Sequence, residues 1–236
     1  MKKIFEKNEV LFSILLIIIY VVINMICVQN FGNTSLVSVI VNSVFSILLI
    51  LLMIYLKRIS YYGLVMPNNI KSCLYFIPLV LIVSVNLWSG ININNTKEEI
   101  IYHILTMINI GFLEEIIFRG FLFKAMAKDN VKSAIVVSSL TFGIGHIVNL
   151  LNGADLVPTI IQIISAISIG YLFVMIFHYS NSLIPCIVAH GLINSFSIFY
   201  KENDLLLYLT GIFLIIVPFV YSIVIKKMNE KYRRYI

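Results

Sequence analysis

The stretch "GFLEEIIFRG", residues 111–120, places two carboxylates and one guanidinium inside an apolar run of membrane-helix length. A charged side chain at the centre of a bilayer costs at least ~2.5 kcal/mol, so such residues usually face a bundle interior or a water-filled cavity. Glu114, Glu115 and Arg119 therefore predict a polar interior within a membrane-embedded fold. The rest of the chain must supply the helices that enclose it.

The composition of the chain indicates its fold class. Its 236 residues are 60% hydrophobic and only 12% charged, with a mean hydropathy of +1.00, which exceeds what a soluble domain would bury. Isoleucine, leucine and valine run without polar alternation, and a membrane-spanning backbone must bond internally, so helices fit better than barrel strands. We predict one all-α domain, residues 1–236, built as a polytopic membrane helix bundle. Its expected transmembrane helices, about eight of ~20 residues each, are residues 10–29, 36–56, 73–90, 99–123, 134–151, 158–177, 184–199 and 205–225.

Basic residues are distributed unevenly along the chain. Fourteen of the 17 lysines and arginines lie near the two termini and in alternate loops, residues 57–71 and 124–132. The opposite loops hold only Lys97 and Lys201, and Arg119 lies within a span. Because cytoplasmic loops of membrane proteins are enriched in basic residues, we predict a multi-pass protein of the cell membrane with both termini cytoplasmic. This distribution accounts for the net charge of +6 without a nucleic-acid partner.

The two glutamates of the opening stretch differ in their expected neighbours. Glu115 and Arg119 are four residues apart, so they share one helix face and the guanidinium is expected to hold that carboxylate. Glu114 points about 100° away around the helix and has no such local partner. A buried carboxylate without a cation is a candidate general base. The alternative is a structural ion pair beside a protonated Glu114.

Two later spans carry further polar residues at a spacing of four. The stretch "LTFGIGHIVN" places Phe142 and His146 on one helix face, and "SLIPCIVAHGLINSF" does the same for His190 and Asn194. Either pair alone is explained by hydrogen bonding between membrane helices, whereas two donors aimed at one point are what an oxyanion needs. At 1.5 Å per residue, Glu114 and the two histidines lie ~9 to 18 Å from the expected cytoplasmic helix ends. They are therefore expected to meet between the membrane midplane and the cytoplasmic face.

Taken in order, these motifs resemble one family of membrane proteins. The resemblance is to the CPBP family, the CAAX proteases and bacteriocin-processing enzymes also called Abi proteins, which include the type II CAAX prenyl proteases. It covers roughly residues 100–200, the expected protease core. The motifs are Glu-Glu-x-x-x-Arg (Glu114, Glu115, Arg119), Phe-x-x-x-His (Phe142, His146) and His-x-x-x-Asn (His190, Asn194).

The resemblance implies an intramembrane endopeptidase, a hydrolase that cleaves a small protein or peptide precursor near the cytoplasmic side. Carried over residue by residue, Glu114 works with His146 to activate a water molecule. His190 and Asn194 stabilise the oxyanion of the tetrahedral intermediate. The implied partners are a peptide substrate and the lipid bilayer.

The resemblance also implies supporting roles for three residues. Glu115 with Arg119 would fix the helix and its charge, and Phe142 would pack beside the site.

The residue types leave the question of a metal cofactor open. Members of the family are often labelled metalloproteases, and Glu114, His146 and His190 would be the ligands of a Zn²⁺ ion with one open position. The sequence has no HExxH motif, however, and the fourth residue of the set, Asn194, is a poor zinc ligand. We favour a metal-free site with glutamate-activated water.

Three other functions fit parts of the pattern. A non-proteolytic membrane partner, such as a bacteriocin-immunity protein or a regulator of a sensor kinase, would keep the fold and tolerate Glu114→Ala. A transporter would use Glu114, His146 and His190 as a proton relay. A thiol peptidase would use Cys186, His190 and Asn194, but it would leave the glutamate pair without a role.

Overall fold

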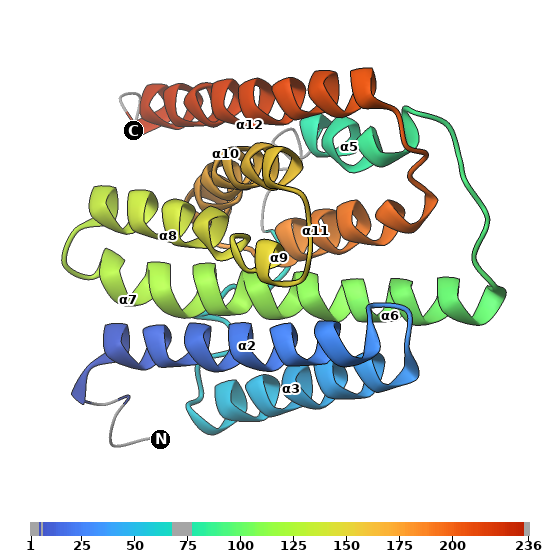
Figure 1. Cartoon of the computed structure of the whole chain (residues 1–236). Helices are drawn as coiled ribbons and strands as arrows, with labels where there is room; N and C mark the ends of the chain where they lie inside the picture. Colours follow the sequence, from blue (N-terminus) through green and yellow to red (C-terminus); the bar gives the residue numbers. More distant parts are fainter. Residues whose placement is uncertain (1–4, 6, 68–76, 234–236) are drawn as a thin grey trace.

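The computed structural model describes residue 5 and residues 7–67 and 77–233. These residues form a bundle of helices, without a named strand among them (Figure 1). Two apolar helices are shorter than a full crossing, Pro78–Leu87 and Ile184–Phe199. The helices long and apolar enough to cross a membrane are Glu9–Phe31, Leu36–Tyr55, Lys97–Ala127, Val131–Leu151, Leu156–Ser180 and Asp204–Glu230. The predicted all-α polytopic bundle is confirmed.

The long central helix separates the bundle into two sides (Figure 1). α2 and α3 lie along one side of it, whereas α8 and α11 pack on the other side, with α10, α5 and α12 beyond them. The first part of the chain forms α2 (Glu9–Phe31), α3 (Leu36–Tyr55), α5 (Ile77–Ser84) and η2 (Val85–Leu87). The second part forms α6 (Lys97–Glu114), η3 (Glu115–Phe123), α7 (Lys124–Ala127), α8 (Val131–Gly145), α9 (Val148–Leu151), α10 (Leu156–Ser180), α11 (Ile184–Phe196), η4 (Ser197–Phe199) and α12 (Asp204–Arg233).

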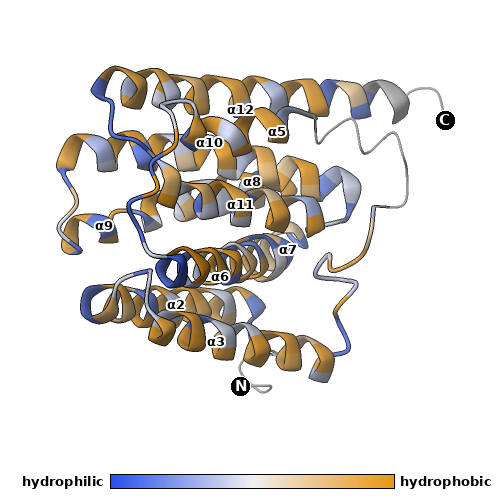
Figure 2. Cartoon of the chain, turned by 90° about the vertical axis from the view of Figure 1, so that its right-hand side faces the viewer, coloured by the Kyte–Doolittle hydropathy of each residue, from blue (hydrophilic) through white to orange (hydrophobic). Residues whose placement is uncertain are grey.

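The long helices consist mostly of apolar residues (Figure 2), and many of these residues have exposed side chains. On α2, for example, Ile18 is 53% exposed and Ile26 is 50% exposed. Many such side chains follow one another along the same helices, and large contiguous apolar surfaces of this kind are typical of contact with lipid. The exposed apolar faces therefore mark the surface that contacts the bilayer.

The central helix changes its winding at the glutamate pair. α6, η3 and α7 run on without a break, but the nine residues of η3 form a π-helix, and all nine are buried. Ser138 on α8 donates a hydrogen bond to the carbonyl oxygen of Phe118 within this segment, at 2.9 Å. Because π-helical turns are rare and are frequent at functional sites, the segment after Glu114 is a candidate site on backbone grounds alone.

Glycines allow the helices around this segment to approach closely. A Cβ atom on Gly111 of α6 would lie 2.7 Å from the backbone nitrogen of Gly191 on α11. Such small-residue crossings are typical of membrane helices, because they bring backbones together without intervening side chains. The crossing brings the start of η3 close to the middle of α11.

Two of the expected spans are altered in the structure. The helix expected at 73–90 is described only from residue 77, and it ends at Leu87, where Asn86 bonds the carbonyl oxygen of Ile193 at 2.7 Å. Residues 73–76 lie outside the described part. The helix expected at 134–151 ends at Gly145 and resumes as the single turn α9, so His146 lies at a helix end.

Candidate active site

The ion pair expected within the opening stretch is present and completely buried. Arg119 donates from Nη1 to Oε1 of Glu115 at 3.1 Å, and neither side chain has any exposed surface. The guanidinium also lies 4.0 Å from the ring centroid of Phe142, within the range of a cation–π interaction. Space for it exists because residue 170 is glycine: a Cβ atom there would lie 3.0 Å from Nη2 of Arg119. The pair is therefore held by packing on several sides.

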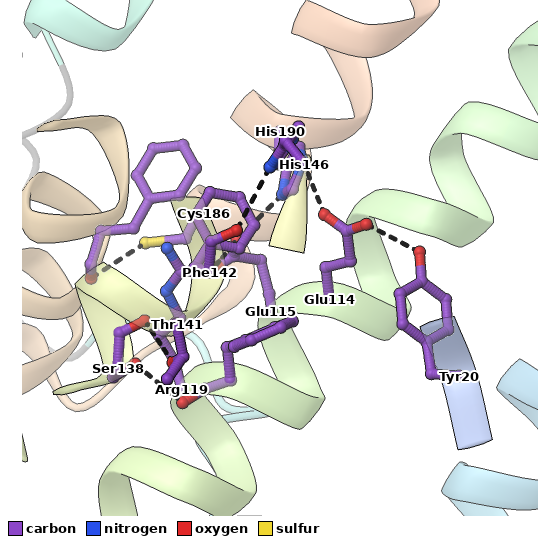
Figure 3. A network of polar contacts seen from close by, with 12 residues as sticks. Tyr20, Glu114, Glu115, Arg119, Ser138, Thr141, Phe142, His146, Cys186 and His190 are labelled. Carbon is purple, nitrogen blue, oxygen red and sulfur yellow. Dashed lines mark hydrogen bonds and ion pairs between the residues drawn. The ribbon is translucent and has the colours of Figure 1, made fainter. Parts of the chain in front are cut away.

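Glu114, the preceding residue, faces a different environment. Its side chain is 15% exposed, compared with 0% for Glu115. The hydroxyl of Tyr20 on α2 donates to its Oε1 atom at 2.7 Å, and Oε2 lies 3.5 Å from Nε2 of His190 (Figure 3). Glu114 is thus positioned by Tyr20 and lies close to His190. Among the described residues, it has no arginine partner of the kind that Glu115 has.

His190 connects the two glutamates. Its Nδ1 atom lies 2.9 Å from Oε1 of Glu115, and its Nε2 atom faces Glu114. Because Oε1 of Glu115 also accepts from Arg119, we assign the hydrogen to Nδ1 of His190, which donates it to this oxygen. Nε2 then carries a hydrogen only when the ring is a cation.

The second predicted histidine lies beside the first. His146 follows the last residue of α8, and its Nδ1 atom bonds the carbonyl oxygen of Phe142 at 3.2 Å, which leaves Nε2 outside that contact. The ring of Phe142 makes edge contacts with both imidazoles, with centroid distances of 5.3 Å to His146 and 5.5 Å to His190. Phe142 therefore orients both histidines and covers the guanidinium of Arg119.

All four predicted catalytic residues line one cavity of about 560 Å³. This volume is within the range of small-ligand pockets and accommodates a short peptide segment. Tyr20 belongs to the lining, together with Glu114, His146, His190 and Asn194. The structure thus brings the residues of the three motifs to one place, on α6, α8 and α11.

The cavity extends away from the side that holds the termini. Its lining reaches Asn33, Asn152 and Leu207, near loops on the opposite side, a direction that the sequence did not predict. The reason is packing, because η3 and the aromatic residues that follow the cluster fill the terminal side of the bundle.

Two residues outside the three motifs contribute to the site. Tyr20 lies on the first span, to which the sequence analysis assigned no role in the site. The sequence feature that could have indicated it is the pair of polar residues Tyr20 and Asn24, four residues apart in an apolar helix. His103 on α6 is buried, and its Nε2 atom lies 3.2 Å from the carbonyl oxygen of Asn194 and 3.1 Å from the hydroxyl of Ser197. It fixes the end of α11 that carries Asn194.

Two alternative chemistries gain no support from the geometry. Cys186 is fully buried, its thiol points to the carbonyl oxygen of Phe173 at 3.6 Å, and it is not among the cavity-lining residues. Within the described parts of the chain, no three His, Cys, Asp or Glu side chains converge as metal ligands. The described residues as placed do not form a zinc site.

The fold and the site together define a polytopic membrane protein with a buried glutamate–histidine cluster beside a cavity. The family model described as "Type II CAAX prenyl endopeptidase Rce1-like" matches residues 96–196, the segment that contains all three motifs. This match confirms the resemblance to the CAAX protease family and supports a CAAX-type intramembrane endopeptidase in general terms. Searches among curated proteins and among solved structures gave no match.

Proposed function

We propose that the protein is an intramembrane endopeptidase in which Glu114 is the general base. The observation that carries this proposal is the contrast between two adjacent carboxylates. Glu115 is neutralised by Arg119 and completely buried, whereas Glu114 lines the cavity and is held by Tyr20. A general base must be oriented, near its substrate and free of a permanent cation.

In the proposed reaction, a water molecule in the cavity lies between Glu114 and His146. Glu114 accepts one proton from this water, and the resulting hydroxide forms a bond to the carbonyl carbon of the scissile peptide. The proton then passes from Glu114 to the leaving nitrogen as the C–N bond breaks. The products are a carboxylic acid and an amine, so atoms and charge balance without a further reagent.

The oxyanion formed by this attack needs hydrogen-bond donors. Nε2 of His190 serves as a donor when the ring is a cation, because Nδ1 is already committed to Glu115. Asn194 lines the same cavity, one helical turn further along α11, and its amide supplies the second donor. Removing one donor of this kind typically costs about 10²- to 10³-fold in rate.

The test is cleavage by the purified full-length protein in detergent micelles. The probes are a pool of quenched-fluorescent peptides and, in a separate arm, a farnesylated peptide ending in a CAAX sequence. Glu114→Gln is the inactivating variant, and Glu98→Gln, an exposed glutamate at the start of the same helix, is the matched control. Products are identified by mass spectrometry, and a parallel sample contains a chelator.

The expected result is cleavage by the wild type and by Glu98→Gln, with loss of product for Glu114→Gln. Cleavage should resist the chelator if Glu114 activates the water without a metal. Loss of cleavage in the chelator would contradict metal-free activation of the water. Equal cleavage by Glu114→Gln and the wild type would overturn the assignment of the base. A cellular phenotype that survives Glu114→Ala, with no cleavage by any form, would favour the non-proteolytic partner.

A further inference from the structure

The cavity lining reaches only one side of the bundle. The turn after α2 contributes Asn33, the end of α9 contributes Asn149 and Asn152, and the first turns of α10 contribute Gln162. We call these four residues the amide mouth. They belong to the side that also holds the starts of α6 and α12, opposite the α7–α8 turn (Figure 1).

The amide mouth and the wall behind it carry unused hydrogen-bond acceptors. The Oδ1 atoms of Asn33 and Asn152 have no partner among the described residues, and the same is true of Oδ1 of Asn24, which lies deeper in the cavity near Tyr20. Buried carbonyl groups are normally paired, so unpaired ones call for a ligand or water. Donors that match them are the N–H groups of a peptide backbone in extended form.

The opposite route out of the site is closed by aromatic packing. Phe12, Tyr62, Phe121, Phe123 and Phe177 are each at most 4% exposed, and we call them the aromatic plug. Within it, the rings of Tyr62 and Phe121 lie 4.3 Å apart, and those of Phe123 and Phe177 lie 6.0 Å apart. None of the five belongs to the cavity lining. A peptide would have to unpack these rings to reach Glu114 from that side.

Polar contacts connect the chain segments that lie next to the aromatic plug. Glu9 at the start of α2 accepts from Arg58 at 2.9 Å and from Lys128 at 2.6 Å. Leu183 donates its backbone N–H to the carbonyl oxygen of Gly63 at 2.8 Å. The segment that contains Gly63 and the ends of α2, α7 and α10 are therefore tied together on the plugged side.

The charges of the loops assign these two sides to the two faces of the membrane. Among the described residues, the plugged side carries ten lysines and arginines, whereas the side of the amide mouth carries Lys97 and Lys201. Basic loops remain in the cytoplasm. The plugged side is therefore the cytoplasmic one, and the amide mouth faces the extracytoplasmic side.

We propose that the peptide substrate reaches Glu114 from the extracytoplasmic side, through the amide mouth. This inference rests on the proposed function and specifies its substrate class: a peptide segment that is already outside the cytoplasm when it is cut. It differs from the expectation, drawn from the family resemblance and from helix depth, that cleavage occurs near the cytoplasmic side. Asn149 donates to Gln162 at 2.8 Å, so the acceptors of the mouth that match backbone N–H groups are those of Asn33 and Asn152, and none of the four residues imposes a charge on the entering segment.

The route can be tested by thiol labelling, without any substrate. Asn24→Cys places a thiol on the cavity wall, and Ile23→Cys places one at nearly the same depth on a lipid-facing position that is 39% exposed. Asn152→Cys at the mouth and Lys132→Cys, at an exposed position in the first turn of α8 on the plugged side, report the orientation. Each variant is treated with a charged, membrane-impermeant maleimide in right-side-out and in inside-out membrane vesicles. The unsubstituted chain, which has three natural cysteines, is the blank.

We expect Asn24→Cys and Asn152→Cys to react in right-side-out vesicles, and Lys132→Cys only in inside-out vesicles. Ile23→Cys should react on the order of a hundredfold more slowly than Asn24→Cys, because a charged reagent must leave water to reach it. Labelling of Asn24→Cys only in inside-out vesicles would overturn the proposal, and so would its failure to react in either preparation while Asn152→Cys reacts.

A second measurement separates this inference from the proposed function. A peptide that is cleaved in detergent is added to right-side-out and to inside-out vesicles that contain the wild-type protein. Product from right-side-out vesicles alone supports the route, and product from inside-out vesicles alone contradicts it. If no peptide is cleaved even in detergent, the proposed function fails, while the labelling result still decides whether the cavity opens outward.

Discussion

Glu114 and Glu115 are neighbours in the chain, but they lie in two regions of opposite character. Behind Glu115, the ion pair with Arg119 is fully buried under Phe142 and next to Gly170. In front of Glu114, a cavity opens and polar contacts come from Tyr20 and His190. The comparison teaches that residue type alone does not assign a role. Packing encloses Glu115 with Arg119, whereas Glu114 remains at the cavity, where we propose that it acts as the base.

The sharpest way to test this contrast is to neutralise the cavity-facing carboxylate. Glu114→Gln keeps the shape of the side chain but cannot accept a proton, so the cleavage rate should fall by about 10²- to 10⁴-fold. The thermal stability of the variant in detergent should stay near that of the wild type. The rate is measured with the quenched-fluorescent peptides, and a large loss of stability would mean that Glu114 is structural as well.

Removing the guanidinium that pairs with Glu115 should lower the stability of the protein, in contrast to Glu114→Gln, which should lower the cleavage rate. Arg119→Ala leaves a buried carboxylate unpaired, which should cost about 3–5 kcal/mol of stability. Unfolding in mixed detergent micelles measures this loss. The double variant Glu115→Gln/Arg119→Met removes both charges and should recover a substantial part of it. No recovery would show that the pair contributes specific geometry beyond charge balance.

The hydrogen bond to Tyr20 is expected to make a smaller contribution to the rate. Tyr20→Phe removes a hydroxyl that donates to Glu114 at 2.7 Å, and hydrogen bonds to charged groups are worth about 1.5–3 kcal/mol. The cleavage rate should fall by about ten- to a hundredfold through misplacement of the base. Tyr102→Phe on α6, a tyrosine outside the cavity lining, is the control and should leave the rate unchanged.

The smallest expected effect concerns the space beside Arg119. A methyl group at Gly170 would meet Nη2 of Arg119 and the ring of Phe142 at 3.0 Å, so Gly170→Ala should cost about 1 kcal/mol. Gly145→Ala on α8 is the matched control, because a Cβ atom there has no neighbour within 4 Å. Equal unfolding midpoints for the two variants would indicate that the region around Arg119 is more loosely packed than described.

Local features of the sequence predicted a good part of this arrangement. Apolar runs located the helices, because a span must be long and apolar to cross lipid. A spacing of four located the pair Glu115 and Arg119, because that geometry lies within one helix. The three motifs indicated a shared site on α6, α8 and α11 before any coordinate was known.

Contacts between helices could not be predicted in the same way. Tyr20 meets Glu114 across 94 positions of sequence, and His190 meets Glu115 across 75. Such pairs depend on how closely the helices cross, as at Gly111, and on the π-helical winding of η3. Neither property has a periodic signature in the residues. For the same reason, the direction in which the cavity opens became visible only in the assembled bundle.

The most direct measurement is a crossed comparison of Glu114→Gln and Glu115→Gln in proteoliposomes, with cleavage rate and unfolding midpoint determined for each. The account predicts that Glu114→Gln loses cleavage at an unchanged midpoint, and that Glu115→Gln lowers the midpoint because Arg119 and His190 lose their anionic partner. Wild-type cleavage by Glu114→Gln, or a midpoint lowered equally by both variants, would contradict the division of roles between the two carboxylates.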